Sequence, residues 1–182
     1  MSRLFVAIKI PDYVTNNLLN VCRKLADTHL EFKWEQPEKV HVTLKFIGEV
    51  EERFVAQITQ ELYFIRNYNS FIFSVAKFGF FFRNGEPRIL WAGLKTDESI
   101  HMLVEELNIR LSIFSVPAEK RKFEPHLTLL RIKKNPGNEF INKFKEHSFE
   151  DMTFKSNQIK LIESKLSHSG ARYSDIKKYD LK

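Results

Sequence analysis

A short pattern that occurs twice places the strongest constraint on what this chain can fold into. It reads His, apolar, Thr, apolar, first at His41–Leu44 and again 85 positions later at His126–Leu129. Both copies lie in apolar, β-rich runs, and residues two apart in a strand point to the same face. Each strand therefore presents an imidazole and a hydroxyl about 7 Å apart on one face and buries apolar side chains with the other. We expect a fold built around two such half-buried strands.

The sequence around the two copies alternates between helical and strand patterns. Apolar residues at helical spacing predict helices, runs rich in Val, Ile and Phe predict strands, and Asn84–Gly85 predicts a hairpin turn. Neither a low-complexity segment nor a long linker interrupts the pattern, so we expect one α+β domain over residues 1–182. The predicted helices cover residues 12–28, 51–68, 100–111 and 138–147, and the predicted strands cover 3–10, 40–47, 71–82, 88–94, 126–132, 158–166 and 171–179.

Composition excludes several classes of protein. With 43% hydrophobic and 29% charged residues in 182, the chain resembles neither a disordered segment nor a collagen-like or disulfide-rich protein. The single cysteine, Cys22, falls on the apolar stripe of the first predicted helix, which favours a core residue over a catalytic thiol. The apolar run Leu4–Ile8 is too short for a signal peptide or a membrane span. We expect a cytoplasmic protein with no membrane partner.

The positive charge is unevenly distributed along the chain. The formal net charge is +6, and residues 118–182 hold all of the surplus, with 15 basic and 9 acidic side chains. One interpretation is a solvated surface, and the other is a basic rim that guides a polyanion into a site. The clusters Lys120–Lys122 and Lys133–Lys134 flank the second copy of the pattern, which favours the rim.

Two imidazoles, each paired with a hydroxyl, suit a displacement at phosphorus. A neutral His removes a proton from attacking water, and a protonated His gives one to the leaving oxygen, because imidazole populates both forms near neutral pH. The hydroxyls of Thr43 and Thr128 can hydrogen-bond the non-bridging oxygens as charge develops. This chemistry needs no metal or other cofactor. A two-histidine metal site is the competing interpretation, but neither copy supplies a nearby carboxylate or Cys as a third ligand.

Other side chains near the two copies are weaker candidates. Lys45 shares the face of His41 and Thr43, although a lysine near a strand end is usually just solvated. Phe46 has the parity of a core residue. The chain also has 17 Phe residues, which could stack nucleobases, although core packing is the simpler account. The aromatic residues considered for stacking are Phe71, Phe73, Phe78 and Phe80–Phe82.

The paired pattern resembles the two-histidine phosphoesterase superfamily, and the whole chain resembles its bacterial and archaeal branch of RNA 2′,3′-cyclic phosphodiesterases, also called 2′-5′ RNA ligases, with a LigT-like fold. The two histidine motifs are specific as a pair, and the other matching stretches support them. The stretches that carry the resemblance are Arg3–Ile8, His41–Gly48, Pro87–Leu94, Pro125–Arg131 and Glu163–Gly170.

The resemblance implies a fold and a reaction. It implies two pseudo-symmetric lobes, each a small, mainly antiparallel sheet backed by helices, with a central cleft that holds one His-Thr pair from each lobe. The implied reaction hydrolyses RNA 2′,3′-cyclic phosphate ends to 2′-phosphomonoesters without a metal. In this scheme His41 protonates the leaving 3′-oxygen, His126 activates water, and Thr43 and Thr128 hold the phosphate. Arg131 corresponds to a basic residue after the second motif in relatives, which implies that it contacts the phosphate. Strict alternation, however, places Arg131 on the strand face opposite to that of His126.

Alternative functions remain open at this stage. The same site could act on other nucleotide cyclic phosphates or on 2′-5′ linkages, including reversible 2′-5′ ligation. A non-catalytic module that binds RNA ends is a hypothesis from another class, but binding alone needs Arg or Lys more than titratable imidazoles. The expected partner is RNA with a 2′,3′-cyclic phosphate end, with tRNA fragments as a candidate source, and the expected oligomeric state is a monomer.

Overall fold

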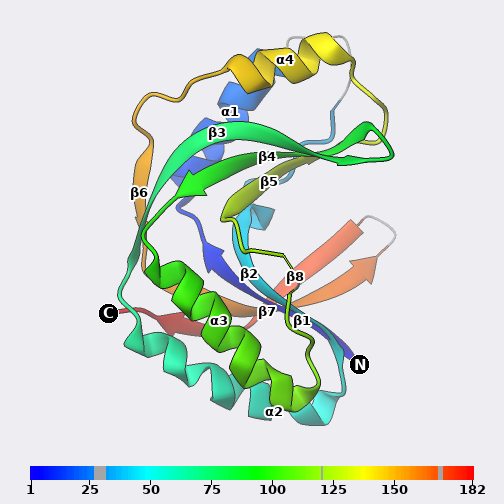
Figure 1. Cartoon of the computed structure of the whole chain (residues 1–182). Coiled ribbons are helices and arrows are strands. Elements are labelled where there is room, and N and C mark those ends of the chain that lie inside the picture. Colours follow the sequence, from blue (N-terminus) through cyan, green and yellow to red (C-terminus); the bar gives the residue numbers. More distant parts are fainter. Residues whose placement is uncertain (27–31, 120, 168–169) are drawn as a thin grey trace.

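Two antiparallel sheets of four strands form the centre of the computed structural model, which describes residues 1–26, 32–119, 121–167 and 170–182 (Figure 1). The strand order is β2-β1-β7-β8 in the first sheet and β5-β4-β3-β6 in the second. The first sheet consists of β1 (Ser2–Lys9), β2 (His41–Val50), β7 (Gln158–Ser167) and β8 (Gly170–Asp180), and the second of β3 (Phe71–Arg83), β4 (Glu86–Lys95), β5 (His126–Arg131) and β6 (Thr153–Ser156).

The helices lie on the outer sides of the two sheets (Figure 1). α1 follows β1 of the first sheet but packs against α4, which itself contacts β3 of the second sheet. α3 follows β4 of the second sheet but contacts β2 of the first. One continuous apolar cluster therefore includes residues of both sheets. The helices are α1 (Asp12–Ala26), α2 (Glu52–Glu61), α3 (Ser99–Leu111) and α4 (Asn138–Glu146), with short 3₁₀ helices η1 (Pro37–Lys39), η2 (Leu62–Asn67) and η3 (Ser112–Phe114).

The α+β architecture with two antiparallel sheets confirms the predicted fold class. The predicted helix over 51–68 divides into α2 and η2, and residues 27–28 of the first predicted helix lie outside the described ranges, as does Lys120. The turn at Asn84–Gly85 has positive φ at both residues, as a tight hairpin turn requires. β6 was not predicted, because its four residues are too few for a strand pattern to stand out. In the described part of the chain, no helix is long and apolar enough to cross a membrane.

Cys22 is buried on α1, as predicted for a core residue. Burial raises the pKa of its thiol, which disfavours the reactive thiolate. The predicted core packing of the phenylalanines holds for Phe71, Phe73, Phe78 and Phe80, but it is wrong for Phe81 and Phe82, which are exposed.

A β-bulge interrupts each copy of the repeated pattern at the same place. In β2 the partners of Val6 and Ala7 are Lys45 and Thr43, so Leu44 is the extra residue. In β5 the partners of Leu90 and Trp91 are Leu130 and Thr128, so Leu129 is the extra residue. An extra residue reverses the alternation of side chains beyond it. The two matching bulges thus change the sheet face to which the side chains beyond them point.

The bulge in β2 corrects two predictions made from strict alternation. Phe46 is not a core residue, since 62% of its surface is exposed. Lys45 is not solvated, because its side chain is buried and its Nζ donates a hydrogen bond of 2.5 Å to the carbonyl oxygen of Pro117. Burial lowers the pKa of the Lys45 ammonium. This contact ties β2 to the segment that leads into β5.

Candidate active site

His41 begins β2 and is enclosed by two aromatic rings. Its imidazole stacks on Phe5 of β1 at 5.1 Å between ring centroids, and it forms a T-shaped contact with Tyr173 of β8 at 5.6 Å between centroids. Burial among these rings lowers the pKa of His41 from 6.5 to about 4, because the charged form loses solvation. A hydrogen bond with the backbone of Lys39 opposes this shift, and the positive charge of Arg131 adds to it. His41 is therefore neutral near pH 7 in the free protein.

His126 occupies the matching position at the start of β5. Its Nδ1 lies 2.8 Å from the carbonyl oxygen of Glu124. A carbonyl oxygen only accepts, so Nδ1 carries a proton and Nε2 is the nitrogen left for chemistry in the neutral ring. Phe81 and Trp91 pack against the imidazole in T-shaped arrangements, with centroids 5.2 and 6.2 Å away. Both histidines are thus held by the backbone two residues earlier in the chain.

The two threonines of the pattern lie on the same strand faces as the histidines. Thr43 and Thr128 are half-buried, whereas their neighbours Val42 and Leu127 are fully buried in the core. Neither threonine hydroxyl has a hydrogen-bond partner within the part of the chain that the structure describes. Both hydroxyls are therefore available as donors to an oxyanion.

Arg131 reaches the face of His126 because the bulge at Leu129 reverses the alternation. Its Nε donates to Oε1 of Glu35 at 3.1 Å, and its side chain remains 65% exposed. The segment that carries Glu35 is joined to β5, since the Glu35 amide donates to the Leu129 carbonyl at 2.9 Å. The charge of Arg131 also acts on His41 across the junction. A β5 side chain thus contributes to the surroundings of a β2 histidine.

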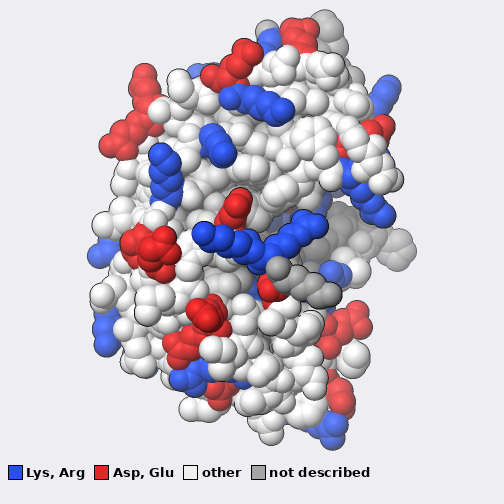
Figure 2. All heavy atoms as spheres, viewed as in Figure 1, with Lys and Arg blue, Asp and Glu red and all other residues white. Residues whose placement is uncertain are grey.

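β2 and β5, the strands that carry the two copies of the pattern, contact each other where the two sheets meet. Lys and Arg side chains form a row across the middle of the face in Figure 2, over the region where β2 and β5 lie in Figure 1. Among the described residues, no group of three or more His, Cys, Asp or Glu could hold a metal ion.

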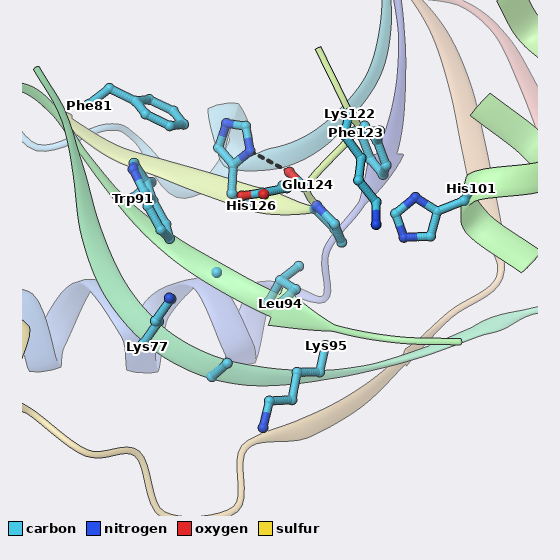
Figure 3. A pocket seen from close by; sticks show the side chains of 13 residues that line it. Lys77, Phe81, Trp91, Leu94, Lys95, His101, Lys122, Phe123, Glu124 and His126 are labelled. Atoms are coloured by element: carbon cyan, nitrogen blue, oxygen red, sulfur yellow. Dashed lines mark hydrogen bonds between the residues drawn. The ribbon is translucent and has the colours of Figure 1, made fainter. Parts of the chain in front are cut away.

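A pocket of about 460 Å³ opens beside His126 (Figure 3). Trp91 and Phe81 from β4 and β3 lie at its end nearest His126, and His101 from α3 lies at the other end. Three lysines from three different segments also line it, namely Lys77, Lys95 and Lys122. Glu124 adds an acidic side chain to the wall.

Sequence reasoning named only Phe81 among the residues around the two histidines, as one of several candidates for base stacking. Phe5 and Tyr173 come from strands far from His41 in the sequence, and no spacing pattern links them to it. Trp91 lies within the matching stretch Pro87–Leu94, and this position was the signal that could have found it. His101 reaches the pocket only because α3 packs beside the segment that precedes β5.

The low pKa of His41 predicts a stability change with pH. The unfolded chain binds a proton at this residue below pH 6.5, but the folded protein does so only near pH 4. Stability from the neutral imidazole is therefore complete above pH 6.5 and is lost as the pH falls toward 4, by about 3 kcal/mol. Urea unfolding of wild type and His41→Gln at pH 7.5 and pH 4 measures this loss. The free energy of unfolding should fall between the two pH values by about 3 kcal/mol more in wild type than in His41→Gln. An equal loss in both proteins would contradict the buried, neutral His41.

Comparisons with known proteins identify the family of the chain. Residues 8–91 match the family described as LigT like Phosphoesterase. An RNA 2′,3′-cyclic phosphodiesterase of Thermotoga maritima is 31% identical over 172 residues, covering 94% of this chain and 91% of the relative. One from Archaeoglobus fulgidus is 29% identical over 180 residues, covering 98% and 99%.

Solved structures show the same fold. A protein of Thermus thermophilus superposes with a TM-score of 0.81 at 22% identity, covering 98% of this chain and 97% of that one. Escherichia coli LigT complexed with 3′-AMP gives a TM-score of 0.74 at 20% identity, covering 99% and 97%. With its sequence matching these relatives over nearly its full length and its two sheets matching these structures, the chain belongs to the LigT-like phosphoesterase family.

Proposed function

We propose that this enzyme hydrolyses RNA 2′,3′-cyclic phosphate ends to 2′-phosphomonoesters by metal-independent catalysis with His41 and His126. The observation that carries the proposal is the pair of matching bulged strands, each with a backbone-held histidine and an unpaired threonine hydroxyl, in contact where the sheets meet. The names of the Thermotoga and Archaeoglobus relatives support the choice of substrate.

The reaction requires one proton to be removed and one to be supplied. Nε2 of His126 takes a proton from water as the water oxygen forms a bond to phosphorus. The bond between phosphorus and the 3′-oxygen breaks, and His41 protonates that oxygen. The product is a 3′-hydroxyl with a 2′-phosphomonoester, and a proton transfer through solvent restores both imidazoles. Thr43 and Thr128 donate hydrogen bonds to the non-bridging oxygens, whose charge increases in the transition state.

His41 holds no proton near pH 7 until substrate binds, because burial lowers its pKa to about 4. The phosphodiester carries a negative charge, and an anion next to an imidazole favours the protonated form. Binding therefore counteracts burial and supplies the proton donor at the time it is needed. Arg131 provides a further cation for the phosphate, and its contact with Glu35 holds the guanidinium at the junction of the sheets.

The proposal also covers the source of the RNA, the oligomeric state and the location of the protein in the cell. The protein acts as a single two-lobed domain over residues 1–182, as a monomer in the cytoplasm, on RNA ends that include tRNA fragments. The row of Lys and Arg in Figure 2 supports a polyanionic partner.

The direct test uses an RNA oligonucleotide that ends in a 2′,3′-cyclic phosphate, with EDTA present. The expected product is a terminal 2′-phosphate, which ³¹P NMR distinguishes from a 3′-phosphate. A 3′-phosphate product would contradict the departure of the 3′-oxygen, and turnover that EDTA abolishes would contradict metal independence. Binding of the oligonucleotide without turnover would replace the enzyme with an RNA-end binding module.

A further inference from the structure

We propose that the pocket beside His126 binds a second nucleotide of the RNA, the neighbour of the one that carries the cyclic phosphate. Its base would stack on Trp91, and its phosphate would lie among Lys77, Lys95 and Lys122. This inference rests on the proposed function and deepens it, because it makes an RNA chain a better substrate than a mononucleotide cyclic phosphate.

Trp91 forms a flat aromatic surface at one end of the pocket. Its cross-strand partner in β3 is Gly79, and a Cβ atom at Gly79 would lie only 2.2 Å from the indole. A Cβ atom at Gly93 would lie 3.0 Å from the same ring. One ring face thus rests directly on glycine backbone, which leaves the other face to line the pocket. Phe81 supports the indole with a centroid distance of 5.4 Å.

The charges of the pocket suit a phosphate. Lys77, Lys95 and Lys122 are lining residues, and none of them forms an ion pair with a described carboxylate. Glu124 is the acidic residue of the lining, so the lining contains three lysines and one carboxylate. Figure 3 shows the aromatic residues beside His126, with Lys77 and Lys95 along the strands and Lys122 near His101. An aromatic surface next to cations is the arrangement that single-stranded RNA stacks on.

The size and position of the pocket fit the same ligand. Its volume of about 460 Å³ lies within the range of small-molecule sites. His126 is part of its wall, whereas His41 is not. A nucleotide in the pocket would therefore lie on one side of the reacting phosphate, where a continuous RNA chain can reach it.

A fluorescence titration tests the pocket without relying on catalysis. Trp34 and Trp91 are the two tryptophans of the chain, so Trp34→Phe leaves Trp91 as the sole reporter. We expect a dinucleotide that ends in a 2′-phosphate to quench Trp91 fluorescence saturably and a nucleoside 2′-phosphate to leave it unchanged. In this background, Lys77→Ala/Lys95→Ala/Lys122→Ala should weaken the binding of the dinucleotide by at least about tenfold, as the loss of several phosphate contacts implies. A control that removes two lysine charges elsewhere is Lys24→Ala/Lys155→Ala, because both lysines are exposed and lie outside the pocket.

A kinetic comparison provides the second test. The readout is the ratio of kcat/KM for a dinucleotide and a mononucleotide 2′,3′-cyclic phosphate. Wild type should favour the dinucleotide by roughly 5- to 100-fold, the range expected for stacking one base on an aromatic ring. Trp91→Leu and the triple lysine variant should bring the ratio close to one. Gly79→Ala should lower it as well, because the added methyl group displaces the indole.

Three outcomes would overturn the inference. The first is equal kcat/KM for the two substrates in wild type, and the second is a ratio of kcat/KM that the variants leave intact. The third is quenching of Trp91 by the mononucleotide alone, which would put the terminal base in the pocket. If wild type hydrolysed neither substrate, the proposed function would fail. The titration of Trp91 would still decide whether the pocket binds a second nucleotide.

Discussion

Replacing either histidine by alanine should lower kcat on a cyclic phosphate substrate by about 2–4 orders of magnitude, the contribution typical of one general acid or base. His41→Ala removes the proton donor, and His126→Ala removes the group that activates water. Initial rates on the cyclic-phosphate oligonucleotide measure both effects. The matched control is His147→Ala, because this imidazole packs against Phe78 and Phe149 and lies outside the candidate site. Its rate should stay within about twofold of wild type.

Binding measurements separate the loss of catalysis from the loss of the site. Both alanine variants should still bind the oligonucleotide, since Thr43, Thr128 and Arg131 remain. Retention of wild-type turnover in either variant would contradict the two-histidine account. A substrate with sulfur in place of the 3′-oxygen assigns the roles, because a thiolate leaves without being protonated. His41→Ala should then recover most of its activity, and His126→Ala should not.

Loss of a threonine hydroxyl should also slow the reaction strongly. Thr43→Val and Thr128→Val keep the shape of the side chain and remove a donor to the non-bridging oxygens. We expect kcat to fall about 10- to 1,000-fold for each, with a smaller change in KM, because these hydrogen bonds strengthen as charge develops.

The serine variants are the matched controls for this prediction. Thr43→Ser and Thr128→Ser keep the hydroxyl and lose only a methyl group, so they should recover most of kcat. If the valine variants raised KM alone, the hydroxyls would bind substrate and transition state equally, and a role in stabilising the transition state would be wrong.

The repeated motif predicted the two strands and their polar faces, because side chains in a strand alternate with a period of two. Alternation failed after Thr43 and Thr128, where both strands contain a bulge. In β5 two adjacent apolar residues, Leu129 and Leu130, are both buried, and such a pair indicates a bulge already in the sequence. In β2 the second buried residue is Lys45, and a lysine does not indicate burial in the sequence. The burial of this amine depends on the Pro117 carbonyl, 72 residues away.

The surroundings of the histidines could not be predicted from local patterns. The packing of Tyr173 against His41 depends on the pairing of β7 with β1 and of β8 with β7. The place of Trp91 depends on the register that sets Gly79 opposite it. Both contacts join segments far apart in the sequence, so the strand order and register had to be known first.

The pH dependence of kcat/KM for wild type tests the central claim most directly. The active form is the singly protonated enzyme, with one imidazole neutral and one charged. The account predicts a bell-shaped profile whose acidic limb lies near pH 4, where His41 of the free enzyme takes up its proton. In His126→Ala the remaining rate should instead fall as the pH rises above about 4, because only protonated His41 is then required. A wild-type profile with no acidic limb near pH 4 would contradict the role of His41, and a profile with no basic limb would contradict acid–base catalysis by the two histidines.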